Sequence, residues 1–310
     1  MVNHFVELLI AALLLLGPAP RAAAQVVRTL AGGGAGGGTL GGSSNGDAVT
    51  AARYNMPCGV AVDPATGNVY IADTGNHKLR LIFPNLTVVT LAGGNTTGTA
   101  SGFLNGVGTA ALFNQPYGVA VDASGNVIVA DSSNHCIRKV TPGGAVSTLA
   151  GSGSAMFADG TGTNAAFFNP YGVAVNTSGG VIVADTNNHK IRLIDPINFA
   201  VTTLAGGSSS GSSNGLGTAA LFNQPNGVAV DTASGNVVVV DTSNHKVRLI
   251  FSNLTVITLV GGGSLGTSSG ATNGFGTNAL FILPRGVDVD PSSGNVCKFP
   301  RAHTKNPYQT

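Results

Sequence analysis

Residues 59–82, GVAVDPATGNVYIADTGNHKLRLI, decide the fold of this chain of 310 residues. The same pattern returns at residues 118–140, 172–194 and 227–250, and it begins a fifth time at Gly286. The first glycines of successive copies lie 54 to 59 residues apart. A repeat of this length, built from short apolar runs separated by Gly, Asn and Asp, is typical of stacked supersecondary units.

Each unit contains four runs that are typical of β-strands. In the first unit these are residues 59–63, 69–73, 78–82 and 87–91, and turn-forming residues separate them. The runs are apolar at successive positions, which suits a strand whose two faces are both covered by neighbouring sheets. The pattern predicts an all-β fold, a β-propeller of four-stranded blades.

The stretch GVAVD…GNVYIADTGNHKLRLI resembles the NHL repeat, which is named for its Asn-His-Leu core. That core reads Asn-His-Lys-Leu at residues 76–79 and returns in modified form at Asn134, Asn188 and Asn244. The resemblance extends from Val26 to about Val296. It implies a propeller whose first strand in each blade lines the central axis and whose fourth strand is outermost. It also implies six blades as the usual number.

The fifth unit departs from the pattern after Val296. Residues 297–310, CKFPRAHTKNPYQT, show no strand periodicity, and Pro300 and Pro307 oppose pairing. We therefore expect four full blades plus a truncated fifth, in an incomplete or open ring. The propeller is assigned to residues 25–296 and a non-repeat tail to residues 297–310.

Residues 1–24 have the layout of a secretory signal peptide, with an apolar run at 8–17 and Arg-Ala-Ala-Ala before Gln25. The alternative is an uncleaved anchor, but the run is shorter than the roughly 20 residues that span a bilayer. We predict cleavage after Ala24, a secreted protein and no membrane span. Four sequons are then candidate glycosylation sites. They begin at Asn85, Asn95, Asn176 and Asn253.

The charge balance argues against a nucleic-acid partner, because 15 basic and 13 acidic residues leave a formal net charge of only +2. Most carboxylates recur once per blade, and we expect them to cap turns and to pair between blades. The histidines of the repeat lie on different blades, too far apart to share a metal ion, so a structural role is expected. They are His77, His135, His189 and His245. No catalytic residue, metal site or cofactor is predicted.

A long Gly-rich connection joins each blade to the next, for example at residues 93–116. Its end recurs as Gly-Thr-Ala-Ala-Leu-Phe at 108–113 and at 217–222. We expect one short helical turn here with Thr as its cap and with Phe as a buried anchor. The simplest interpretation is a structural plug between blades.

The residue immediately before the first glycine of each unit does not repeat, although everything around it does. These residues are Cys58, Tyr117, Tyr171, Asn226 and Arg285. In a propeller they are expected near the axial mouth, on the same face as the long loops, where ligand sites are common. Our hypothesis is that they rim a ligand-binding pocket. The alternative is ordinary variation at an exposed loop end.

Two functions are compatible with these patterns. The first is a secreted, non-enzymatic NHL propeller that binds a protein or glycan ligand through its long-loop face. The alternative is an extracellular propeller enzyme, either a metal-dependent lyase or a lactonase-like hydrolase. Resemblance to such enzymes implies metal ligands in the central channel, usually His, Asp, Glu or Asn. The inner strands here offer mainly Val, Ala and Gly, which favours the binding function.

Overall fold

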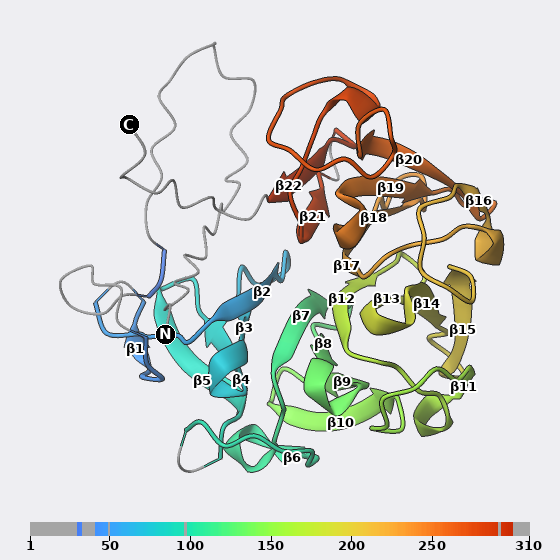
Figure 1. The fold of residues 1–310 in the computed structure, drawn as a ribbon. Coiled ribbons are helices and arrows are strands. Elements are labelled where there is room, and N and C mark those ends of the chain that lie inside the picture. Colours follow the sequence, from blue (N-terminus) through green and yellow to red (C-terminus); the bar gives the residue numbers. More distant parts are fainter. Residues whose placement is uncertain (1–29, 33–40, 49, 96–97, 291–292, 300–310) are drawn as a thin grey trace, which may run out of the picture.

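The structure is a computed structural model, and it describes residues 30–32, 41–48, 50–95, 98–290 and 293–299. The predicted signal peptide at 1–24 and residues 300–310 of the predicted tail lie outside these ranges. Four antiparallel sheets of five strands follow one another along the chain, and a two-stranded sheet follows them. Figure 1 shows the five sheets set in chain order around a common centre, with the first and the fifth at the two ends of an arc.

The blades share one strand order. The strands are β1 (Gly46–Asp47), β2 (Pro57–Val62), β3 (Val69–Asp73), β4 (Lys78–Ile82) and β5 (Thr87–Gly93) in blade 1; β6 (Gly106–Val107), β7 (Pro116–Val121), β8 (Val127–Asp131), β9 (Cys136–Val140) and β10 (Ala145–Ala150) in blade 2; β11 (Gly160–Thr161), β12 (Pro170–Val175), β13 (Val181–Asp185), β14 (Lys190–Ile194) and β15 (Ala200–Ala205) in blade 3; β16 (Gly215–Leu216), β17 (Pro225–Val230), β18 (Val237–Asp241), β19 (Lys246–Ile250) and β20 (Thr255–Gly261) in blade 4; and β21 (Gly286–Val289) and β22 (Val296–Phe299) in blade 5. The prediction of an all-β propeller with four full blades and a partial fifth is confirmed, and an open ring is compatible with this arrangement.

Two details of the strand prediction are wrong. Each full blade has five strands, because a two-residue strand from the long connection pairs with the fourth strand, as Gly46 does with Val88. Two residues are too few to show a period of two in the sequence. In addition, Gly286 pairs with Phe299. Strand pairing in the fifth blade therefore passes the boundary that we placed at Val296.

Eight short 3-10 helices connect the strands within the described ranges. Four follow the second strand of a blade: η1 (Thr74–Asn76), η3 (Ser132–Asn134), η5 (Thr186–Asn188) and η7 (Thr242–Asn244). Four end the long connections: η2 (Gly108–Ala110), η4 (Gly162–Asn164), η6 (Gly217–Ala219) and η8 (Gly276–Asn278). The helical turn was predicted correctly but its cap was not, because Thr109 lies inside η2 and no side chain caps that helix.

The hydrophobic core lies between neighbouring blades. Between blades 1 and 2, for example, Tyr70 and Leu79 pack in one cluster with Val119 and Val129. Three of the predicted anchors of the connections, Phe113, Phe167 and Phe222, are fully buried in the successive clusters, whereas the other two, Tyr54 and Phe281, are half-buried. A blade buries its two faces against its two neighbours, which explains why its strands are apolar at successive positions.

The inner strands approach one another through the first glycine of each repeat. A Cβ built on Gly118 would lie 2.2 Å from the carbonyl oxygen of Tyr171, and one built on Gly172 would lie 2.3 Å from that of Asn226. Real Cβ atoms do not come so close to oxygen. The glycine is therefore required by the contact between inner strands, which sets the radius of the central channel.

The two faces of the propeller differ. At one end of each blade the inner strand begins, the second strand ends and the fourth strand ends; in blade 1, Pro57 pairs with Asp73, and Lys78 with Gly93. We call this end the loop face, because the long connections and the helices after the second strand lie there. The opposite end carries the short hairpin turns and is called the turn face. Among the described residues, no helix is long and apolar enough to cross a membrane.

Candidate functional site

Each full blade contains a buried ion pair on the loop-face side. The distances between Arg Nη1 and Asp Oδ2 are 2.9 Å for Arg80–Asp73, 2.7 Å for Arg138–Asp131, 2.7 Å for Arg192–Asp185 and 3.0 Å for Arg248–Asp241. All eight side chains have 0% exposure. The expectation that these charges pair between blades is wrong, because both partners stand on one hairpin.

The pair also holds the long connection in place. In blade 2, the other carboxylate oxygen of Asp131 accepts a 2.7 Å bond from the N–H of Asn114, where the connection enters the blade. Arg138 Nη2 donates to the carbonyl of Leu104 and to Asn105 Oδ1. These buried groups fix the backbone of the connection, so we interpret them as a framework. The aspartates at the end of the inner strand cap turns as predicted, as Asp63 does for Ala65 and Thr66.

The repeated histidines join neighbouring blades. Each adopts a left-handed backbone conformation and accepts a backbone N–H at Nδ1 from the residue that leads into the next inner strand. The donors are Gln115 to His77 (3.0 Å), Asn169 to His135 (3.2 Å), Gln224 to His189 (3.0 Å) and Leu283 to His245 (3.1 Å). The predicted structural role is confirmed by these bonds.

Stability is expected to fall in mild acid, because a protonated imidazole cannot accept a hydrogen bond at Nδ1. Burial lowers the pKa of His135. As the pH falls below about 6.5, the unfolded chain binds protons before the folded chain does, so stability decreases until the folded pKa is passed. We therefore expect the melting temperature to fall more between about pH 7.5 and about pH 5 in the wild type than in the variant His135→Asn.

Asparagine is a matched replacement because it tolerates the left-handed conformation and does not titrate. Burial raises the pKa of Asp131 to about 6, and this shift alone would stabilise the fold as the pH falls. The wild type and the variant both contain Asp131, so this effect is common to the two proteins. Equal acid shifts in the two proteins would rule out His135 as a source of the pH dependence.

Four of the five unrepeated residues gather at the axial end of the loop face. The rings of Tyr117 and Tyr171 stack with centroids 4.5 Å apart and planes inclined by 21°. Arg285 Nη1 donates a 2.9 Å hydrogen bond to Tyr117 Oη, although the two residues are 168 positions apart. Cys58 lies beside the Tyr117 hydroxyl. We call Cys58, Tyr117, Tyr171 and Arg285 the axial cluster.

The fifth residue, Asn226, is buried, and its carbonyl oxygen lies against Gly172 at the start of the neighbouring inner strand. Burial raises the pKa of the Cys58 thiol and of the Tyr117 hydroxyl. Both groups therefore stay protonated at neutral pH, and Arg285 supplies the charge of the cluster. The arrangement offers a cation beside an aromatic pair, which can bind a ligand but contains no base to activate one.

The sequons lie mostly away from the axial cluster. Asn85 and Asn253 are exposed in hairpin turns of the turn face, whereas Asn95 is exposed on the loop face. Asn176 is half-buried, and its Oδ1 accepts bonds from the backbone of Ser178 and Gly180 in the turn where other blades use Asp. Glycosylation at these positions stays a prediction.

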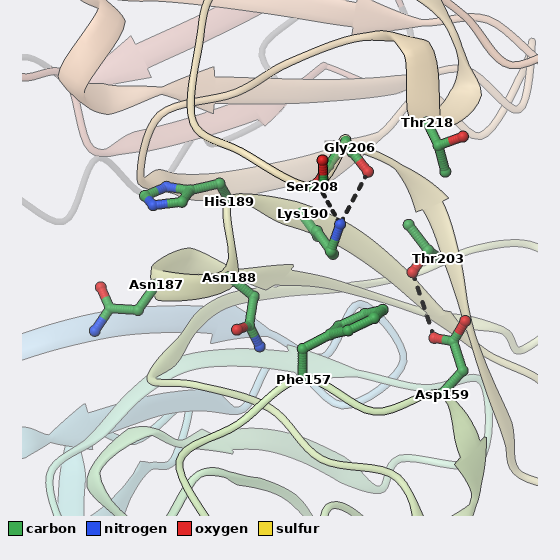
Figure 2. Close-up of a pocket in the computed structure, with 11 residues that line it drawn as sticks. Phe157, Asp159, Asn187, Asn188, His189, Lys190, Thr203, Gly206, Ser208 and Thr218 are labelled. Atoms are coloured by element: carbon green, nitrogen blue, oxygen red, sulfur yellow. Dashed lines mark hydrogen bonds between the residues drawn. The ribbon is translucent and has the colours of Figure 1, made fainter.

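A second candidate site, which the sequence patterns did not reveal, lies on the loop face of blade 3. It is a cavity of about 680 Å³, shown in Figure 2. Its lining residues are Phe157, Asp159, Asn187, Asn188, His189, Lys190, Thr203, Gly206, Gly207, Ser208 and Thr218. The hint in the sequence is that Asp159 precedes Gly-Thr-Gly-Thr where two other connections have asparagine before Gly-x-Gly-Thr, at Asn105 and Asn214.

The sequence matches the family model of the NHL repeat at residues 54–80, 113–140, 167–192 and 222–248. It is 35% identical over 157 residues to the protein SUPPRESSOR OF QUENCHING 1, chloroplastic, of Arabidopsis thaliana; this covers 49% of the chain and 15% of that protein. It is 34% identical over 151 residues to NHL repeat-containing protein 2 of Bos taurus, covering 44% of the chain and 21% of that protein. Each match takes in a small part of the relative.

Solved structures with a similar fold include a chain of a nidogen/laminin complex, with a TM-score of 0.55 and 16% identity, covering 81% of this chain and 74% of that one. A gluconolactonase of Xanthomonas campestris has a TM-score of 0.53 and 15% identity, covering 80% and 73%. At these identities the likeness shows the fold alone. The four matched repeats and the blades that they form identify this chain as an NHL repeat-containing protein.

Proposed function

We propose that this chain is a secreted binding scaffold that captures a protein partner at the axial cluster of its loop face, without catalysing a reaction. The observation that carries this proposal is the convergence of Tyr117, Tyr171 and Arg285, which come from three blades and are the unrepeated residues of a repeated framework. Tyr and Arg dominate the binding energy of protein interfaces. The signal peptide predicted at residues 1–24 supports the extracellular setting.

The chemistry of the cluster indicates the kind of group that it receives. Arg285 is exposed, and its single side-chain bond within the described residues is to Tyr117. A guanidinium with free N–H groups beside an aromatic face favours a carboxylate, which it can bind with two parallel hydrogen bonds. A partner with an exposed Asp or Glu therefore fits this surface.

The enzyme alternative has less support. The similar folds include both a gluconolactonase and a chain of a protein complex, so fold alone does not choose between the two functions. The axial cluster contains no carboxylate and no imidazole. Across the described residues, His, Cys, Asp and Glu side chains nowhere gather in groups of three or more that could hold a metal ion.

The experiment is a screen of the purified chain against an array of extracellular protein domains, followed by affinity measurements on the proteins that bind. Arg285→Ala and Tyr171→Ala are each expected to weaken binding by about tenfold, the size of effect typical of a central interface residue. Ile197→Ser is the control, because Ile197 is exposed on the turn face.

Affinities that are the same for wild type and for both cluster variants would refute the axial site. Hydrolysis of gluconolactone by the purified chain, above the rate without protein, would support the enzyme alternative instead.

A further inference from the structure

We infer that the cavity on the loop face of blade 3 is a binding site for a neutral sugar ring. This site is separate from the axial cluster and does not depend on the proposed function. Three connected features of blade 3 create it, and they concern Asp159, Phe157 and Lys190. Blade 2 also has a phenylalanine in its connection, Phe103, but it has Cys136 in place of the lysine and Asn105 in place of the aspartate.

The first feature is Asp159, which replaces an asparagine of the other full blades and has an oxygen in place of the amide nitrogen. In blade 2, Asn105 Oδ1 accepts bonds from Arg138 Nη2 (2.7 Å) and from Thr148 Oγ1 (3.3 Å). In blade 3, Asp159 Oδ1 accepts the same two bonds, from Arg192 Nη2 (2.6 Å) and Thr203 Oγ1 (3.3 Å). Blades 1 and 4 also have asparagine at this position, Asn45 and Asn214.

The framework is therefore satisfied equally well by asparagine. What the aspartate adds is its second oxygen: an N–H donor in the other blades is replaced by a charged acceptor. The Asp159 side chain is 49% exposed, so this oxygen is open to a ligand. A carboxylate oxygen is a strong acceptor for hydroxyl groups.

The second and third features open the space. In blades 1 and 4 the lysine of the third strand reaches across to the preceding connection, where Lys78 Nζ bonds the carbonyl of Ser43 and Lys246 Nζ that of Ser212, both at 2.9 Å. In blade 3 the equivalent connection residue is Phe157. Lys190 Nζ turns instead to the carbonyls of Gly206 and Gly207 in its own blade.

Lys190 and Phe157 then form one wall of the cavity. Lys190 is only 8% exposed, and its Nζ lies 4.8 Å from the centroid of the Phe157 ring. Phe157 itself is 46% exposed. Figure 2 shows Phe157, Lys190 and Asp159 around the same space, with Ser208 and Thr218 on its far side.

The pairing of charges selects a neutral ligand. An anion would meet the Asp159 carboxylate, and a cation would meet the Lys190 ammonium. A sugar ring avoids both penalties, because its hydroxyls can donate to Asp159 and accept from Lys190, and its C–H face can cover exposed Phe157. The volume of about 680 Å³ is within the range for small-molecule sites.

The test uses a panel of methyl hexopyranosides, N-acetylhexosamines and hexuronic acids with isothermal titration calorimetry on the whole chain. At least one neutral sugar should bind saturably to the wild type. The double variant Phe157→Ser/Asp159→Asn should lose about tenfold or more in affinity. It carries the residues of blades 1 and 4, so it should keep the melting temperature of the wild type.

Asn214→Asp in blade 4 is the matched control, and it should leave sugar affinity unchanged. Saturable binding that persists in the double variant, or a preference for uronic acids over neutral sugars, would overturn the inference, as would the absence of binding to the whole panel. Arg285→Ala should leave sugar binding intact. A failure of the sugar-site inference can therefore be distinguished from a failure of the proposed axial site.

Discussion

Replacing Arg138 by Met is expected to lower the free energy of unfolding by about 3–5 kcal/mol, as measured by urea denaturation. The guanidinium and the Asp131 carboxylate both have 0% exposure, and their bond is 2.7 Å long. Without the arginine, a carboxylate remains buried with no compensating charge. The substitution also removes the bonds to Leu104 and Asn105, which hold the long connection against the blade.

The double variant Arg138→Met/Asp131→Asn tests this reason. The amide oxygen that the second substitution introduces can still accept the N–H of Asn114, but no buried charge is left without a partner. The double variant should therefore be more stable than Arg138→Met alone. If the two variants unfold at the same urea concentration, buried charge is not the main cause of the loss.

Replacing Gly172 by Ala is expected to cost about 3 kcal/mol, the upper part of the usual range for overpacking. The added Cβ would lie 2.3 Å from the carbonyl oxygen of Asn226 and 3.0 Å from the N of Val228. Both atoms belong to the backbone of the next inner strand, so no side chain can move aside. Relief requires blades 3 and 4 to separate along the channel.

Gly143→Ala is the matched control, because Gly143 is exposed in a hairpin turn and its nearest neighbour to an added Cβ would be Thr141 Oγ1 at 3.9 Å. Thermal melts of the two variants give the comparison. A Gly172→Ala protein that melts with the wild type would show that the inner strands tolerate a wider channel.

The framework was largely readable from the sequence. The spacing of the GVAVD units predicted the blades, and the recurrence of Phe113, Phe167 and Phe222 marked the anchors that the structure buries. Because each histidine recurs once per blade, the sequence also favoured a structural role for the histidines over a shared metal site. It did not show that Asp131 pairs with Arg138, because each residue recurs once per blade and the spacing fits pairing within a blade or between blades equally well.

The sequence predicted the residues of one candidate site, the axial cluster, and missed the other. The axial residues were found because they vary where their surroundings repeat, yet the contact of Arg285 with Tyr117 joins blades 5 and 2 and needs the curvature of the arc. The blade 3 cavity was missed. Asp159 aligns with Asn105 in the sequence, because each precedes Gly-x-Gly-Thr, but the alignment shows neither the bond of this residue to the framework arginine nor the turn of Lys190 away from the connection.

The sequence by itself determined the blade: its strand runs, its turns and the glycine at the inner edge follow from local patterns that repeat. Only the tertiary structure decided what the blades do together. Residues far apart in the chain meet at the axis and in the cavity because neighbouring sheets bury their faces against one another. That packing fixes positions which no single repeat encodes.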